Sequence, residues 1–231
     1  MDFLGEGFRR AWVLLSLGDS EVYGIAALTL KVAALATIIS CAAGLPLGYF
    51  LATRRFWGRR AALTVVNTAL AFPTVVVGLL LYGLLSRQGP LGGLGWLYTW
   101  QAIVLGDVIL ALPIAAALSA AAIQGVDARI RRTAETLGAG RWRTAWTVAR
   151  EARFALAAVL TAAFGQCVAE IGAAMIVGGN IRGSTRTLTT AVALYTSQGD
   201  FGLALALGLV LVLLALVINV VLQVLQGRGH A

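Results

Sequence analysis

Residues 131–151 read RRTAETLGAGRWRTAWTVARE, which is the most highly charged passage of the chain. Apolar segments flank it on both sides, at residues 100–124 and 152–178. A membrane span needs about 20 predominantly apolar residues, so each flanking segment is long enough to cross a bilayer. The charged passage therefore connects two predicted spans, and its own structure should indicate what the connection does.

The first half of this connector predicts a short helix. Ile130, Ala134 and Leu137 recur at i, i+4 and i+7, which places them on one helical face. Asp127 stands just ahead of them, where its side chain can accept hydrogen bonds from the first free N–H groups of the helix. We expect a helix that begins after Asp127 and ends near residue 137.

The second half predicts a glycine turn followed by another helix. Gly138 and Gly140 end the first pattern, because glycine readily adopts the left-handed conformation that stops a helix. Apolar residues then recur at i, i+3, i+4 and i+7, at Trp142, Ala145, Trp146 and Ala149. Such an amphipathic pair either lies on the membrane surface, where it merely anchors the topology, or inserts into the groove of a partner.

The composition of the whole chain is that of a membrane protein. Hydrophobic residues make up 59% of the 231 residues, charged residues make up 12%, and the mean hydropathy is +0.86. Soluble domains have about 45–50% apolar and about 25% charged residues. The net charge of +8 comes from arginines in a few connectors, so we expect no nucleic-acid partner. Cys41 and Cys167 lie inside apolar runs and are interpreted as small buried hydrophobes.

We predict an all-α integral membrane bundle with five spans. The spans cover residues 27–52, 61–85, 100–124, 152–178 and 201–226. Pro73 and Pro113 are expected to interrupt the second and third spans. Residues 1–26 are interpreted as an extracytoplasmic or interfacial amphipathic segment, because their apolar run is too short for a span. Residues 227–231 form a short tail, and residues 125–151 form the charged connector.

Arginine placement predicts the orientation in the membrane. Connectors rich in Arg and Lys stay in the cytoplasm. The connector 53–60 carries four arginines and no acid, and the connector 125–153 carries seven. The opposite connectors are poorer, with Arg87 in one and Arg182 and Arg186 in the other. We therefore expect both basic connectors in the cytoplasm, the N-terminus outside and the C-terminus inside, in a cytoplasmic (inner) membrane.

The order of residues in TAETLGAGRWRTAW resembles the cytoplasmic loop of ABC importer permeases, written in that family as E-A-A, three residues, G. With the family glycine on Gly138, the alanines fall on Thr133 and Ala134, and Arg132 replaces the glutamate. The resemblance implies that this connector is the coupling helix, which docks into a cleft of a cytoplasmic ATPase subunit. The residues implied in coupling are Ala134, Glu135, Leu137, Gly138, Ala139, Gly140, Trp142 and Arg143.

A second signature follows the fourth predicted span. It combines Glu170-x-Gly172, then Gly178-Gly179-Asn180, then the run TRTLTT at residues 185–190. This combination resembles the permeases of tungstate-type ABC importers. It implies a type I importer fold, a homodimer with the translocation path at its interface, a pair of ABC ATPases and an extracytoplasmic oxyanion-binding protein. Transport would proceed by alternating access, and molybdate or sulfate remain alternative substrates.

Glu170 is the most unusual residue of the fourth span, because a carboxyl group inside a membrane costs about 3 kcal/mol unless it is paired or hydrated. It either lines the translocation path or fixes helix packing, and a carboxylate facing an anion's path would repel the anion. Gly172, Gly178 and Gly179, followed by Asn180, allow close backbone approach. Around a pore they would form a narrow gate. Asp107, in the third span, is assigned a packing or interfacial role.

The residues after Asn180 predict a polar patch near the outer mouth. Its members carry guanidinium or hydroxyl donors that suit an oxyanion, at Arg182, Thr185, Arg186, Thr187 and Thr189. They would contact the oxyanion directly or attract it by charge. The alternative is a solvated loop on which a binding protein docks.

The chain shows no sign of enzyme chemistry. It has no G-x-x-x-x-G-K-[ST] motif to hold a nucleotide, so ATP hydrolysis is expected on a separate subunit. His230 is its one histidine, and we expect no catalytic residue, no metal and no cofactor. Two rival classes stay open. One is an autonomous channel or ion-coupled carrier in which Glu170 titrates, although no inverted repeat of the carrier type is visible. The other is a structural anchor.

Overall fold

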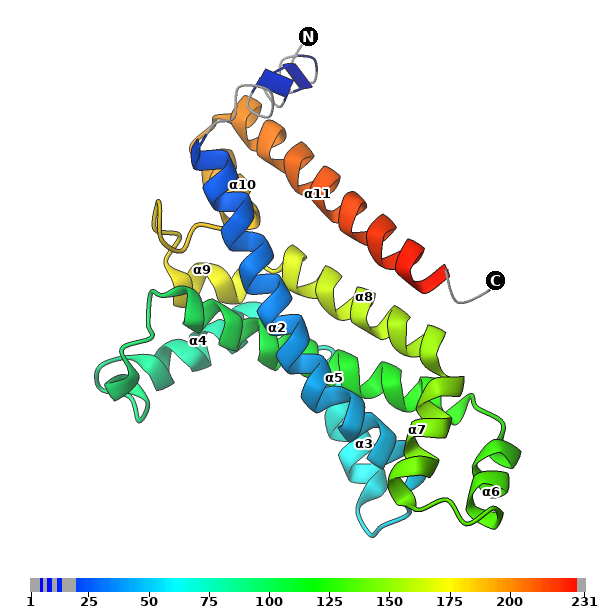
Figure 1. Cartoon of the computed structure of the whole chain (residues 1–231). Coiled ribbons are helices and arrows are strands. Elements are labelled where there is room, and N and C mark those ends of the chain that lie inside the picture. Colours follow the sequence, from blue (N-terminus) through cyan, green and yellow to red (C-terminus); the bar gives the residue numbers. More distant parts are fainter. Residues whose placement is uncertain (1–4, 6–7, 10–11, 14–19, 228–231) are drawn as a thin grey trace.

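The computed structural model describes residues 5, 8–9, 12–13 and 20–227, and those residues form helices and no strand (Figure 1). The all-α prediction is confirmed. The principal helices are α2 (Ser20–Thr53), α3 (Arg59–Ala69), α4 (Thr74–Leu85), α5 (Trp100–Gln124), α6 (Ala128–Thr136), α7 (Arg141–Glu151), α8 (Arg153–Ala169), α9 (Gly172–Gly178), α10 (Leu188–Ser197) and α11 (Phe201–Gly227).

Three predicted spans are confirmed as long apolar helices, namely α2, α5 and α11. Helix α2 begins at Ser20, seven residues ahead of the predicted start at residue 27. The predicted boundary between a terminal segment and the first span therefore falls inside a helix. Most of residues 1–19 and the tail 228–231 lie outside the described residues.

The other two predicted spans are broken. Helices α3 and α4 meet at a bend of 100°, and Pro73 caps the start of α4. Proline is tolerated there because the first N–H groups of a helix have no partner within it. The prediction of one continuous helix over 152–178 is wrong, since α8 ends at Ala169 and α9 starts at Gly172. The predicted interruption at Pro113 is also wrong, because α5 continues through it.

Small residues let α2 and α5 pack closely. A Cβ atom on Gly44 would lie 2.6 Å from the Cβ of Ala115, and one on Gly48 would lie 1.9 Å from the Oγ of Ser119. The Ser119 hydroxyl donates a hydrogen bond to the Gly44 carbonyl at 3.3 Å. Helices in membranes associate mainly through such close packing and interhelical hydrogen bonds. This crossing is therefore a principal contact of the bundle.

Substituting Gly48 by alanine is expected to destabilise the fold by about 1–3 kcal/mol, the usual cost of overpacking. The added methyl group would overlap Ser119 and the backbone of α5. Thermal unfolding of the detergent-solubilised protein would measure the effect. The matched control is Gly165→Ala in α8, where no heavy atom lies within 4 Å of the new Cβ. Unfolding of both variants at the wild-type temperature would contradict this prediction.

The bundle has two distinct ends (Figure 1). Helix α10 and the start of α2 lie at one, called here the α10 end, and α6 and α7 lie at the other, the α6–α7 end. Between them, α2, α5 and α8 enclose the central core, which includes Ala36, Ala115 and Ala163. Helix α9 packs on α4 and α5. Helix α11 packs on α10 and α8, while one of its faces leaves large apolar side chains exposed, at Val212, Leu213, Leu216, Val217, Val220 and Val221.

Candidate functional site

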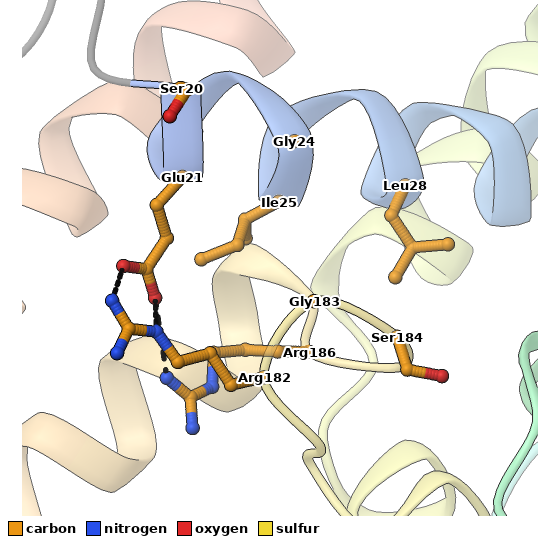
Figure 2. Close-up of a pocket in the computed structure, with 9 residues that line it drawn as sticks. All are labelled: Ser20, Glu21, Gly24, Ile25, Leu28, Arg182, Gly183, Ser184 and Arg186. Carbon is orange, nitrogen blue, oxygen red and sulfur yellow. Dashed lines mark hydrogen bonds and ion pairs between the residues drawn. The ribbon is translucent and has the colours of Figure 1, made fainter.

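A pocket of about 360 Å³ lies at the α10 end, between α2 and the loop that precedes α10 (Figure 2). Glu21 projects from the first turn of α2, and Arg182 and Arg186 project from the loop. Arg182 Nε donates to Glu21 Oε1 at 2.7 Å, and its Nη2 donates to Glu21 Oε2. Arg186 Nη1 is 3.7 Å from the same carboxylate. Two guanidinium groups thus share one carboxylate beside the pocket.

Arg186 is the more enclosed of the two arginines, with 12% of its side chain exposed against 74% for Arg182. Its contacts are long: Nη1 donates to the Tyr195 hydroxyl and Nη2 to the Asn180 carbonyl, each at 3.5 Å. Its Nε is buried and has no hydrogen-bond partner among the described residues. Burying a donor without a hydrogen-bond partner costs free energy. The Arg186 guanidinium is therefore well suited to donate to a further acceptor.

The threonines of the predicted outer patch do not belong to this surface. Thr185, Thr187 and Thr189 are buried, so the prediction of an exposed hydroxyl-rich patch is wrong for them. Thr185 donates to the Gly178 carbonyl at 2.6 Å. Thr187 caps α10 in a reciprocal arrangement with Thr190. These hydroxyls satisfy backbone groups inside the bundle and hold the loop in place, which leaves the two arginines to face the pocket.

Glu170 lies in the break between α8 and α9 and is 5% exposed. Its Oε1 accepts a hydrogen bond from the N–H of Ala173 at 2.8 Å, in the first turn of α9. Its carbonyl accepts from the Thr189 hydroxyl at 2.9 Å. The carboxyl group therefore satisfies a free helix N–H and joins the break to α10. These are the contacts of the packing role, one of the two roles that sequence left open.

The glycines of the predicted gate make close approaches within this chain. A Cβ on Gly172 would lie 2.4 Å from Thr74 Oγ1, which shows that the break after α8 meets the start of α4. A Cβ on Gly178 would lie 2.8 Å from Ile103. Gly179 has φ +69° and rests against Tyr98. Close backbone approach is confirmed, whereas a gate between two chains stays a prediction.

Asp107 and Glu170 line one small interior cavity of about 10 Å³. The hydroxyl-bearing residues Thr187 and Thr189 also line it. Asp107 is buried and its Oδ1 has no hydrogen-bond partner among the described residues. A cavity of this size holds about one water molecule. Asp107 thus belongs to the interior, which agrees with the packing alternative of its prediction and not with the interfacial one.

At the opposite end of the bundle, the helix–turn–helix prediction is confirmed. The Asp127 side chain accepts from the N–H of Arg129 at 2.8 Å and caps α6. Gly138 has φ +79°, the left-handed conformation expected of it. Gly140 has φ −65°, so the same expectation was wrong for Gly140. Arg131 Nη1 donates to the Thr53 carbonyl at 3.2 Å and ties α6 to the end of α2.

Helix α7 buries one face and leaves its apolar stripe open, as predicted for a helix whose stripe meets the membrane surface or a partner. Thr144 and Val148 are its buried residues, and Val148 packs with Ile123 and Ala152. The predicted apolar stripe remains open, with Trp142 90% and Trp146 73% exposed. The stripe therefore faces something other than this chain's own core.

The structure thus separates the predicted residues into three places. The coupling residues gather around the turn at Gly138, the arginines gather at the α10 end, and Glu170 with the threonines lies in the interior. Glu21 is the residue that sequence reasoning missed. Its partner Arg182 is 161 positions away, and no local pattern marks the pair. The only signal in the sequence was that the negative charge of Glu21 is opposite to that of the loop carrying Arg182 and Arg186.

Long apolar helices, two broken spans and an exposed helix–turn–helix define a multi-pass helical membrane protein. Residues 44–228 match the family described as "Binding-protein-dependent transport system inner membrane component", and the chain belongs to this family. The family match confirms the resemblance to ABC importer permeases.

Relatives match over nearly the whole chain. The chain is 38% identical to the tungstate uptake system permease protein TupB of Peptoclostridium acidaminophilum, over 98% of this chain and 99% of that protein. It is 40% identical to TupB of Campylobacter jejuni, over 96% and 92%. It is 32% identical to the molybdenum transport system permease protein ModB of Escherichia coli K12, over 77% and 82%.

A solved structure has the same fold. A bacterial ABC transporter involved in the import of the acidic polysaccharide alginate aligns with 94% of this chain and 83% of its own, with a TM-score of 0.76 and 19% identity. The long helices and broken spans described above therefore belong to an architecture already seen in an ABC importer.

Proposed function

We propose that this chain is the membrane-spanning permease of an ATP-driven importer that translocates an oxyanion, with tungstate as the substrate. The observation that carries the proposal is the enclosed guanidinium of Arg186. This residue lines the 360 Å³ pocket, and its buried Nε has no hydrogen-bond partner among the described residues. Guanidinium groups bind oxyanions through paired N–H donors. The two tungstate permeases among the relatives support the choice of anion.

Glu21 would compete with the anion for the two guanidinium groups. Its carboxylate is a planar acceptor that bridges Arg182 and Arg186, and it occupies the position that an arriving oxyanion would contest. An anion must displace this internal acceptor, so the pocket would hold substrate only briefly. Weak binding suits a path that has to release what it admits. High-affinity recognition would then belong to a separate oxyanion-binding protein that docks at the α10 end.

The energy for transport would enter at the α6–α7 end. The turn at Gly138 and the side chains beside it, including Glu135 and Leu137, are exposed and form the surface proposed to dock on an ABC ATPase. Ala134, Ala139 and Gly140 complete that surface, and Trp142 and Arg143 lie at its edge. The Arg131–Thr53 hydrogen bond links α6 to α2. ATP-driven displacement of α6 would therefore be passed to the longest helix of the bundle.

The proposed assembly contains two copies of this chain, two ATPase subunits and one binding protein. The path would run between the two copies, bordered by the α8–α9 break and Asn180. The α6–α7 end would face the cytoplasm and the α10 end the outside, in agreement with the arginine-rich connectors. The N-terminus would then be outside and the C-terminus inside.

Reconstitution of the chain with its ATPase and binding protein in proteoliposomes tests the proposal. We expect uptake of tungstate that requires ATP and all three components, and that exceeds uptake of molybdate and sulfate at equal concentrations. Uptake of molybdate ahead of tungstate would reassign the substrate within the same class. Anion flux from the chain alone, without ATP, would contradict the importer function and support an autonomous channel.

A further inference from the structure

Two cavities adjoin each other at the α6–α7 end, and they differ in chemistry. One is a polar pocket of about 180 Å³ between α6 and the end of α2. The other is an apolar groove of about 710 Å³ between α2, α7 and α8. Tyr49, Thr53, Arg54 and Arg141 line both cavities. The two spaces therefore adjoin each other at these four polar residues.

The apolar groove is formed by side chains that a soluble protein would bury. Its walls include Leu45, Phe50, Trp142, Trp146, Ala149 and Leu156. The groove continues into a third space of about 500 Å³, which Trp146 and Leu156 also line and which extends along α8 to Leu160. A mainly apolar channel, with Arg150 and Arg153 also on its wall, thus runs from the polar pocket along α8.

The polar pocket carries excess positive charge. Arg54, Arg131 and Arg141 line it together with one acid, Glu135. Glu135 already accepts from Arg131 Nε at 3.0 Å. Arg54 and Arg141 are exposed, and neither guanidinium has a side-chain partner among residues 20–227. Two uncompensated cations therefore stand at the mouth of the apolar groove.

We propose that these joined cavities bind an anionic glycerophospholipid. The phosphate would lie between the guanidinium groups of Arg54 and Arg141, and an acyl chain would lie along the groove past Trp142 and Trp146. Tryptophan suits this depth, because its ring is apolar and its N–H is polar. Basic pockets between membrane helices are established sites for anionic headgroups. A free phosphate ion would satisfy the arginines and leave the groove unfilled.

The bound lipid would add a link between the end of α2 and the start of α7. Arg54 follows the end of α2, and Arg141 is the first residue of α7. A phosphate between them would fix the start of α7 against α2, and with it the turn at Gly138. The lipid is thus inferred to set the resting position of the helix–turn–helix. This inference concerns binding alone and does not depend on which solute the chain transports.

Tryptophan fluorescence tests the site directly. The full chain in neutral mixed micelles is titrated with phosphatidylglycerol or phosphatidylcholine, each brominated on one acyl chain, since bromine quenches tryptophan on contact. We expect quenching at a phosphatidylglycerol fraction at least tenfold lower than for phosphatidylcholine. The double variant Trp142→Phe with Trp146→Phe should remove most of the additional quenching that phosphatidylglycerol causes over phosphatidylcholine. A signal that persists in this variant would place the lipid elsewhere and overturn the assignment.

Charge variants separate this site from general attraction to a basic protein. Arg54→Gln with Arg141→Gln should abolish the preference, because each arginine near an anionic surface contributes about fivefold in affinity. The matched control is Arg55→Gln with Arg60→Gln, which removes the same charge from exposed neighbours that do not line the cavities. The control should keep the preference.

Three results would overturn the proposal. The first is equal quenching by both lipids in the wild type, and the second is an equal loss of preference in the two double variants. The third is displacement of the brominated phosphatidylglycerol by millimolar glycerol phosphate alone, since that would assign the site to a soluble phosphate. Failure of a variant to fold is checked by its elution volume and by its thermal unfolding in the same detergent.

Discussion

Gly138→Val is expected to abolish ATP-driven uptake while leaving the chain folded in the membrane. Gly138 has φ +79°, a conformation that costs an L-residue about 1–2 kcal/mol and a β-branched residue more. Its N–H donates to the Glu135 carbonyl at 3.1 Å, and the next N–H donates to the Ala134 carbonyl at 3.0 Å. Valine would force the turn open and rotate α6 away from α7. We expect at least a tenfold loss of substrate-stimulated ATPase activity.

The control is the same substitution two residues later. Gly140 has φ −65° and ψ 166°, an extended conformation that valine readily adopts. A Cβ atom added to either glycine would have no heavy atom within 4 Å, so the two variants differ in backbone conformation rather than in packing. Gly140→Val adds the same bulk to the proposed docking surface without straining the turn, so it should lose less activity than Gly138→Val. Wild-type uptake by Gly138→Val would disprove coupling through this turn.

Sequence alone predicted the elements whose signals are local. The cap at Asp127, the turn at Gly138 and the apolar helices α2, α5 and α11 depend on residues within a few positions of one another. The break at Glu170 was not foreseen, because hydropathy remains high through residues 171–178 and only tertiary contacts reveal that a carboxyl group caps a new helix there. The effect of a proline could not be predicted for the same reason. The span is broken at Pro73, whereas α5 continues through Pro113.

The candidate sites show the same limit. Sequence predicted that the arginines at the α10 end would donate hydrogen bonds to an oxyanion. It did not predict that the neighbouring threonines are buried, because their burial depends on contacts with α2 and the α8–α9 break. The N–H of Leu188 donates to Thr29 Oγ1 at 2.9 Å across 159 residues. No helical or alternating period encodes such a contact. For α7, the apolar stripe is open as predicted, whereas the burial of Val148 against Ile123 and Ala152 has no local signal in the sequence.

Arg186→Gln is expected to lower oxyanion uptake by at least tenfold at substrate concentrations below saturation. Loss of the enclosed guanidinium removes the donor whose Nε has no partner among the described residues, and a charged hydrogen bond of this kind is worth about 1.5–3 kcal/mol. Arg182→Gln should cost only a few-fold, because Arg182 is 74% exposed and acts through solvent-screened attraction. Initial rates of uptake across a range of substrate concentrations would measure both effects.

Ionic strength separates the two arginines further. An exposed charge that steers an anion loses its effect as salt rises, whereas an enclosed donor that contacts the anion keeps it. The difference between wild type and Arg182→Gln should therefore vanish at high salt, and the difference between wild type and Arg186→Gln should persist. Equal effects that disappear together at high salt would show that the pocket only attracts anions. In that case the donors that contact the oxyanion would have to lie elsewhere on the path, with the interior threonines around Glu170 the next residues to substitute.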